Sequence, residues 1–193
     1  MDNPYLDEFL ASDARFWLDP SKMLELIEAN DPERLISIAN TRHQLVERYA
    51  FGIPDQAAVN LIADQGKPIV EMGAGSGYWA HLLSQVGAEI TAYDQHACDV
   101  WHAVQTGTPE LLADPRWSDH LLLLCWPIDD VGTRSIKAFS GDTVCYVGEW
   151  NGCTADEEFH DLLTDHWTIT AEADLPQWGG IHDSLWILER AAA

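Results

Sequence analysis

The spacing of apolar positions along the chain changes near residue 66. Before that point apolar side chains recur at helical intervals, and the pairs Asp19-Pro20 and Asp31-Pro32 each offer an N-cap followed by a first-turn proline. After it, short β-branched or aliphatic runs alternate with helical stretches, which predicts a mostly parallel sheet with helices on both faces. Strands are predicted at 68–72, 88–93, 100–104, 120–125, 143–148, 167–173 and 184–189, and helices at 77–86, 108–113, 129–139 and 155–165.

The carboxyl edge of this sheet is where a ligand is expected, because open parallel sheets bind ligands beyond the carboxyl ends of their strands. Helical signal fades between residues 173 and 184, so the last two strands are expected to form a hairpin whose connection returns to the same edge. The side chains expected to gather around one cleft there are Trp126, Glu149, Trp150, Trp178, His182 and Asp183.

The stretch Pro68–Leu83, PIVEMGAGSGYWAHLL, combines a strand, a glycine turn and a helix. The dinucleotide fingerprint G-x-G-x-x-G would need a glycine where this chain has Tyr78, and no P-loop pattern is present. Glu71 ends the strand with a carboxylate, which suits an ammonium or hydroxyl group and repels phosphate. A ligand with a nucleoside and an amino acid is therefore predicted. The turn glycines, which let backbone approach it closely, are Gly73, Gly75 and Gly77.

The second predicted strand ends at Asp94, about 20 residues after the first turn glycine, where Rossmann-type sites place an acid for both ribose hydroxyls. The alternative is an aspartate that only shapes a turn. Together, E-x-G-x-G-x-G and this acid resemble motif I and the ribose-binding acid of class I S-adenosylmethionine (SAM)-dependent methyltransferases. A dinucleotide site or a structural glycine turn is the competing interpretation.

The resemblance implies an α/β, Rossmann-like class I methyltransferase fold, with a seven-stranded, mostly parallel sheet, helices on both faces and an N-terminal helical lead-in. A single domain is expected over residues 1–193, with 1–66 as lead-in or lid and 67–193 as the SAM-binding core. SAM is the implied cofactor. The predicted cofactor-binding residues are Glu71, Gly73, Gly75, Gly77, Asp94 and Cys125.

A narrower resemblance covers residues 48–183. The segments RYAFGIP, PIVEMGAGSGYWAHLL, LLLLCWP, YVGEWNGCTADEEFHDLL and LPQWGGIHD are similar to an uncharacterised methyltransferase-like family of bacteria, phages and fungi. That family supplies a fold and a cofactor but no methyl acceptor. YAFGIP is interpreted either as lining the methionine end of the cofactor or, the favoured alternative, as a turn between helices.

Three residues are candidates for the chemical step. Trp126 follows the fourth strand in Cys-Trp-Pro-Ile, where amino-methylating DNA enzymes carry [D/N]-P-P-[Y/F]; it suits stacking on a flat or cationic group, or is a core tryptophan. Glu149 follows a buried strand and is a candidate base or orienting group, with a solvated loop acid as the alternative. His182, beside Asp183, is a second candidate base or a structural histidine.

Composition limits the classes of partner. The 193 residues carry 32 acidic and 10 basic side chains, a net charge of −22 that disfavours nucleic acids, whose binding needs a basic surface. High solubility, adaptation to salt or, ranked low, mimicry of DNA would also explain the acidic composition of this protein.

No apolar run is long enough for a membrane span, no secretory signal is visible, and the scattered cysteines predict reduced thiols in the cytoplasm. No metal site is expected, since Cys and His lack ligand spacing.

These features predict a cytoplasmic SAM-dependent methyltransferase, a transferase that methylates a small molecule or, as second choice, a protein side chain. The alternative is a non-catalytic methyltransferase-like module that binds SAM, another nucleoside or a protein partner. The sequence carries no signal for an oligomeric state.

Overall fold

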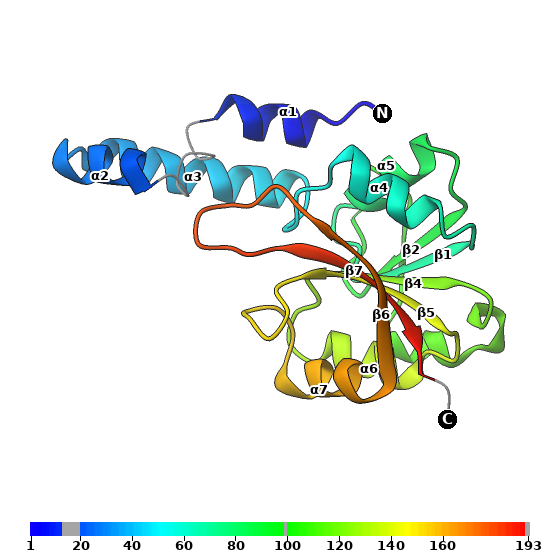
Figure 1. Cartoon of the computed structure of the whole chain (residues 1–193). Coiled ribbons are helices and arrows are strands. Elements are labelled where there is room, and N and C mark those ends of the chain that lie inside the picture. The colour runs from blue at the N-terminus through cyan, green and yellow to red at the C-terminus, as the bar shows by residue number, and fades with distance from the viewer. Residues whose placement is uncertain (13–19, 99, 192–193) are drawn as a thin grey trace.

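The computed structural model describes residues 1–12, 20–98 and 100–191. Its centre is a seven-stranded sheet in the order β3-β2-β1-β4-β5-β7-β6 (Figure 1). All neighbouring pairs from β3 to β5 are parallel, whereas β7 is antiparallel to both β5 and β6. The predicted fold, a mostly parallel sheet that ends in a hairpin, is therefore confirmed. The strands are β1 (Ile69–Met72), β2 (Ile90–Asp94), β3 (Val104–Thr106), β4 (Leu121–Cys125), β5 (Thr143–Gly148), β6 (Trp167–Asp174) and β7 (Ser184–Arg190).

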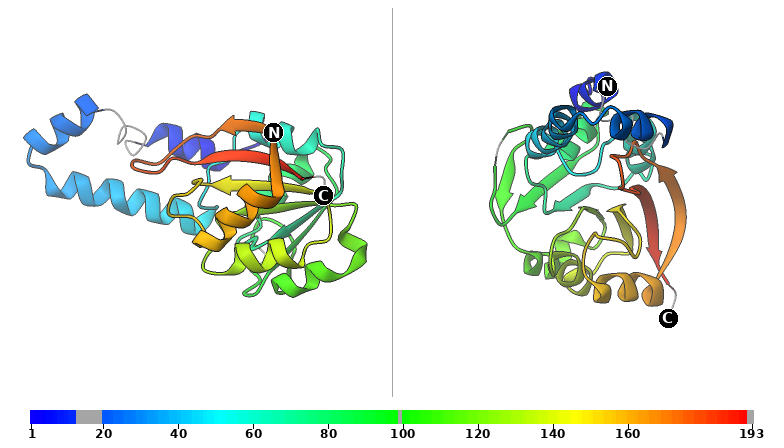
Figure 2. Two further views of the ribbon diagram at one scale, coloured as in Figure 1. Left: turned by 60° about the horizontal axis from the view of Figure 1, so that its bottom comes forward. Right: turned by 90° about the vertical axis from the view of Figure 1, so that its left-hand side faces the viewer.

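Helices cover both faces of the sheet (Figures 1 and 2). One face carries α1 (Pro4–Ala11), the C-terminal part of α3 (Pro32–Arg48), α4 (Gln56–Ala63) and α5 (Tyr78–Gln85). The other carries α6 (Val131–Ala138), α7 (Glu157–His166) and the 3₁₀ helices η2 (Pro109–Ala113) and η3 (Pro115–Trp117). Helix α2 (Pro20–Glu28) lies with the outer part of α3, and both project past the edge that holds the β6–β7 connection.

Strand β4 explains why the sequence contains four consecutive leucines. Leu121 and Leu123 belong to the apolar cluster under α4 and α5, whereas Leu122 and Leu124 belong to the cluster under α6 and α7. Successive side chains of a strand point to opposite faces, so a strand covered on both faces is apolar at every position. This central strand separates two packed cores.

The lead-in is anchored at its first helix. Asn3 caps α1 by accepting a hydrogen bond from the Leu6 N–H at 3.1 Å, and its side-chain amide donates to the Pro54 carbonyl at 2.7 Å. Tyr5 and Phe9 are buried in the same cluster as the sheet. Asp31 caps α3 as predicted, by accepting from the Arg34 N–H at 3.0 Å, whereas the predicted cap Asp19 lies outside the described residues.

Two predicted elements differ from the structure. The strand expected at 100–104 is instead the short β3, which begins at Val104, because Trp101 is engaged in a loop: its backbone N–H donates to the Ser76 carbonyl and its indole N–H donates to the Arg48 carbonyl. The helix expected at 108–113 is the 3₁₀ helix η2. Of the helices in the described ranges, none is long and apolar enough to span a bilayer.

Candidate functional site

A cavity of about 590 Å³ lies at the carboxyl edge of the sheet, within the size range of small-molecule sites. It lies between the tips of β1, β2 and β4 on one side and the end of α3 with the following turn on the other. The side chains and backbone segments that line it include Arg42, His43, Val46, Glu47, Tyr49–Phe51, Glu71–Ser76, Trp79, Asp94–His96, Gly107, Pro109, Cys125–Ile128 and Val131.

The glycine turn has the backbone that its sequence predicts. Gly73, Gly75 and Gly77 have φ angles of +81°, +53° and +77°, a region that side chains of L-residues rarely adopt. A Cβ at Gly77 would also lie 3.1 Å from the His102 backbone nitrogen. At Gly75 nothing lies within 4 Å, so its face of the turn is open to the cavity.

Glu71 is a buried carboxyl group that faces this cavity. The side chain is 1% exposed, and its Oε2 has no hydrogen-bond partner among the described residues. Burial, followed by repulsion from Asp94, raises the pKa of Glu71 to about 8, against an opposing hydrogen bond from the Ala80 backbone. The site thus contains an unsatisfied acceptor that a positively charged group would stabilise.

Asp94 stands at the tip of β2, next to the turn. Its Oδ2 accepts a hydrogen bond from the Gly75 N–H at 3.0 Å, and its Oδ1 accepts from the His96 N–H at 2.7 Å. An ionised carboxylate has about four acceptor positions, so these two bonds orient Asp94 and leave capacity for two hydroxyl donors.

Tyr78, which occupies the position of the third dinucleotide glycine, has a structural role. Its hydroxyl donates to Asn3 Oδ1 at 2.7 Å and accepts from the Tyr5 N–H at 3.2 Å. Its ring packs edge-on against Tyr49 and Trp101. The helix that follows the glycine turn is therefore packed against the lead-in, and a tyrosine at this position is part of the fold.

The tip of β4 carries an aromatic pair. The rings of Phe51 and Trp126 are stacked, with centroids 5.3 Å apart and an interplanar angle of 16°. The Trp126 indole N–H donates to Asp183 Oδ1 at 2.8 Å. Cys125 also lines the cavity, and burial raises the pKa of its thiol well above the usual value.

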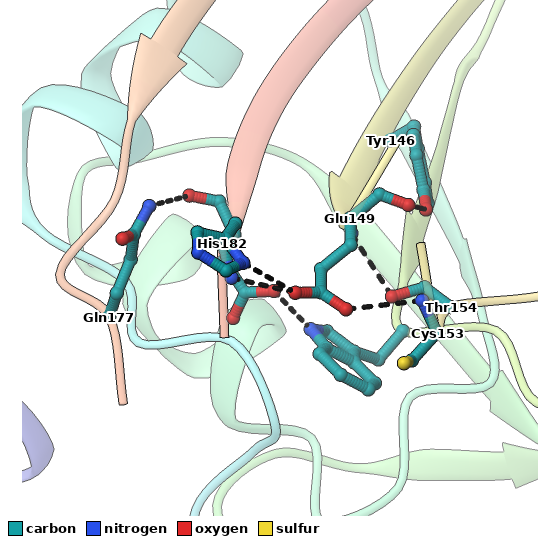
Figure 3. Close-up of polar contacts among 8 residues, drawn as sticks. Tyr146, Glu149, Cys153, Thr154, Gln177 and His182 are labelled. Atoms are coloured by element: carbon teal, nitrogen blue, oxygen red, sulfur yellow. Dashed lines mark hydrogen bonds and ion pairs between the residues drawn. The ribbon is translucent and has the colours of Figure 1, made fainter. Parts of the chain in front are cut away.

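Glu149 and His182 form a separate network near this tip (Figure 3). Glu149 Oε1 accepts from the His182 N–H at 2.7 Å, and Oε2 accepts from the Cys153 N–H at 3.1 Å. Burial favours a higher pKa for Glu149, but these hydrogen bonds prevail and the pKa is lowered. The His182 side chain is 78% exposed, with Nδ1 3.4 Å from Glu149 Oε1. The Glu149 carboxylate thus joins the loop after β5 to the β6–β7 connection.

The structure brings most of the predicted cofactor residues to one cavity. Glu71, Gly73, Gly75, Asp94 and Cys125 line it, and Gly77 closes the turn at the start of α5. Trp126 lines it as well, whereas Glu149 and His182 do not belong to its lining.

The prediction that three tryptophans share the cleft is wrong. Trp178 is buried in the cluster with α1, where it packs edge-on against Phe9, and its indole N–H donates to the Tyr5 hydroxyl at 3.1 Å. Trp150 packs on the opposite face of the sheet, against Trp186. Trp150 follows β5 and Trp178 precedes β7, both at the expected edge of the sheet. Their rings are packed in the two apolar cores instead of the cavity, because burial of aromatic surface is favourable.

Arg42 and Phe51 reach the cavity from α3 and the following turn, although neither is among the site residues predicted from the sequence. Phe51 lies in YAFGIP, whose favoured interpretation was a simple turn. Arg42 had no local signal, because a single basic residue on a polar helix face has the same pattern as a solvated one. In the described ranges, no group of three His, Cys, Asp or Glu side chains is arranged to hold a metal ion.

Comparison with known proteins identifies the fold. No family model and no curated protein matches the chain. Among solved structures, Burkholderia thailandensis 1,6-didemethyltoxoflavin-N1-methyltransferase, with bound 1,6-didemethyltoxoflavin and S-adenosylhomocysteine, aligns over 90% of this chain and 91% of its own, at 14% identity and a TM-score of 0.54. A Streptococcus agalactiae protein of the NADB-Rossmann superfamily aligns over 75% of this chain and 72% of its own, at 14% identity and a TM-score of 0.50. The chain has the Rossmann-like fold of class I SAM-dependent methyltransferases.

Proposed function

We propose that the protein is a SAM-dependent methyltransferase that acts on a small molecule. The observation that carries this proposal is the unsatisfied, buried carboxyl of Glu71, which faces the same cavity as the open glycine turn and Asp94. A buried carboxyl with one oxygen unpartnered in the described chain is costly in the ligand-free protein, and a cationic ligand removes that cost.

The residues present fit SAM. Asp94 has acceptor capacity for the two ribose hydroxyls, and the open space beside the Gly75 Cα accommodates close approach of the ligand. Glu71 suits the positive charge of the amino-acid end. When bound, SAM supplies a methyl group on a sulfonium sulfur, which leaves as a neutral thioether once a nucleophile takes the methyl.

The protein's own contribution is alignment and exclusion of water. The end of α3 and Tyr49–Phe51 cover the cavity from the side opposite the strand tips, so a ligand is enclosed between the lead-in and the sheet. Trp126 stands at the β4 tip, between the Glu71 side of the cavity and the β6–β7 connection.

Glu149 is proposed as a positioning residue. Both of its oxygens are engaged by backbone N–H groups, and its lowered pKa makes it a weak proton acceptor at neutral pH. By holding the His182 backbone it places the neighbouring Asp183, which in turn holds the Trp126 indole. The base role of Glu149 or His182 stays a prediction that the geometry does not favour.

Calorimetry with SAM, S-adenosylhomocysteine and NAD tests the proposal. SAM and S-adenosylhomocysteine are expected to bind and NAD is not. Gly75→Arg is expected to weaken SAM binding by ~100-fold or more, since the new side chain would enter the cavity from the open side of the turn. Gly66→Arg is the control: Gly66 has a similar φ of +66° and open surroundings but does not line the cavity.

Binding of NAD without SAM would overturn the choice of cofactor. SAM binding that survives Gly75→Arg would place the site elsewhere. SAM binding with no methylated product in a broad acceptor screen would favour the non-catalytic binding module.

A further inference from the structure

The cavity has a second half that the cofactor residues leave unassigned. The glycine turn, Glu71 and Asp94 belong to the β1–β2 side, whereas Arg42, Phe51, Trp126 and Ile128 line the β4 side and the inner surface of the lead-in. A methyltransferase must hold its acceptor next to the cofactor, so the chemistry of this half describes the acceptor.

The aromatic pair gives this half a flat, fixed surface. Phe51 is 45% exposed although its ring is stacked on Trp126, so apolar ring area remains uncovered in the cavity wall. Trp126 has a φ of +49°, which is strained for a bulky residue, and its indole is held by buried Asp183. A ring held in this way is preorganised to stack on a planar ligand.

Among the described residues that line the cavity, Arg42 supplies the only Lys or Arg side chain. It is half-buried, and no carboxylate within the described ranges lies at ion-pair distance from it. By contrast, Lys67, Arg134 and Lys137 each pair with an acidic side chain. In a chain with 32 acids, an arginine that lines a cavity and has no acidic partner among the described residues indicates a ligand anion.

The position of Arg42 favours the acceptor over the carboxylate of SAM. The charge of Arg42 acts on Tyr5 and on Asp183, whose pKa burial raises to about 7 while the Trp126 hydrogen bond and, to a smaller extent, Arg42 lower it. Asp183 accepts the hydrogen bond of the Trp126 indole at the tip of β4. The pKa of Glu71, on the cofactor side, responds instead to burial and to Asp94.

We propose that the acceptor is a planar aromatic small molecule that carries a carboxylate, with its ring against Phe51 and Trp126 and its carboxylate on Arg42. This inference rests on the proposed function, because it treats the remainder of the cavity as the cofactor site. A cationic acceptor is disfavoured, since Arg42 would repel it.

Binding to protein saturated with S-adenosylhomocysteine tests the inference by calorimetry. The probes are a hydroxynaphthoate, the matching hydroxynaphthamide, which lacks the charge, and cyclohexanecarboxylate, which lacks the flat ring. The hydroxynaphthoate is expected to bind at least tenfold more tightly than either, in line with the strength of a charge-assisted bidentate pair.

Arg42→Gln is expected to remove the preference for hydroxynaphthoate over hydroxynaphthamide and to leave the SAM affinity within about twofold. Phe51→Ala is expected to weaken both naphthyl probes equally. Arg116→Gln, which removes an exposed arginine that does not line the cavity, controls for the change in net charge and is expected to bind like the parent protein.

The inference is rejected if neither naphthyl probe binds, if the amide binds as tightly as the acid, or if Arg42→Gln weakens SAM instead of the acid. The parent protein is first titrated with SAM and with S-adenosylhomocysteine alone, before any acceptor probe is added. If neither binds, the proposed function itself is rejected.

Discussion

Glu71 links ligand binding to folding at the scale of a single residue. Its carboxyl is buried without a partner for Oε2 in the described part of the chain, and its pKa is raised from 4.5 to about 8. A carboxyl whose pKa is raised by folding stabilises the protein fully below the pKa of the unfolded chain. That stabilisation is lost as the pH rises through the pKa of the folded state.

Glu71→Gln is therefore expected to raise the free energy of unfolding, relative to the parent, as the pH increases from about 4.5 to 8. The gain at pH 8 is on the order of 4 kcal/mol, because each unit by which the pKa of Glu71 is raised corresponds to about 1.4 kcal/mol. Urea unfolding at a series of pH values measures it. Glu172→Gln, on the exposed face of β6, is the control, and equal pH profiles for the two variants would contradict the assignment.

Gly77 illustrates how a glycine can be required for two separate reasons. Gly77→Ala is expected to lower the free energy of unfolding by roughly 3 kcal/mol, since it combines an unfavourable positive φ with a Cβ placed 3.1 Å from the His102 nitrogen. Gly66→Ala has the positive φ alone and is expected to cost about 1 kcal/mol. Thermal unfolding of both variants separates the two terms, and equal losses would show that close approach is unimportant.

The elements of the lead-in are joined to the core by hydrogen bonds between residues distant in sequence. Asn3 connects α1 to the Pro54 carbonyl and to the Tyr78 hydroxyl at the start of α5. Ser76 Oγ donates to the Tyr49 carbonyl, which ties the glycine turn to the end of α3. These bonds hold the covering elements in place over the cavity.

Asn3→Ala is expected to cost about 3 kcal/mol in the free energy of unfolding, because it removes a helix cap and leaves the Pro54 carbonyl and the Tyr78 hydroxyl without this partner. Asp31→Ala removes a similar cap from α3, in an exposed setting, and is expected to cost about 1 kcal/mol. Urea unfolding compares them. A loss for Asn3→Ala no larger than that for Asp31→Ala would mean that the distant bonds add nothing.

Elements that have strong local patterns were predictable. The four consecutive leucines predict the buried strand β4, and the loss of helical periodicity before the last strand predicts the antiparallel β6–β7 hairpin. The strand expected at 100–104 was wrong because the contacts that take Trp101 out of a strand, to Arg48 and Ser76, come from distant segments and have no local signal.

At the scale of the whole molecule, charge is the dominant feature. With 32 acidic and 10 basic side chains, the compact state is opposed by repulsion among carboxylates. Added NaCl screens this repulsion, because the Debye length falls from about 10 Å at 0.1 M to about 3 Å at 1 M. Calorimetric melting is expected to show a midpoint that rises by several degrees between these salt concentrations. A midpoint that falls or stays constant would show that repulsion is not limiting.

The sequence by itself determined the order of strands and helices along the chain and the glycine turn with Glu71 and Asp94 at the strand tips. These features depend on local periodicity, backbone sterics and spacing, which neighbouring residues encode. Only the tertiary structure decided which aromatic rings reach the cavity, that the Glu149 carboxylate joins two loops, and that Arg42 lines the same cavity as Trp126 without an acidic partner in the described chain. These features depend on packing between segments far apart in sequence. That packing buries the Trp178 ring in a core and leaves the Trp126 ring in the cavity wall.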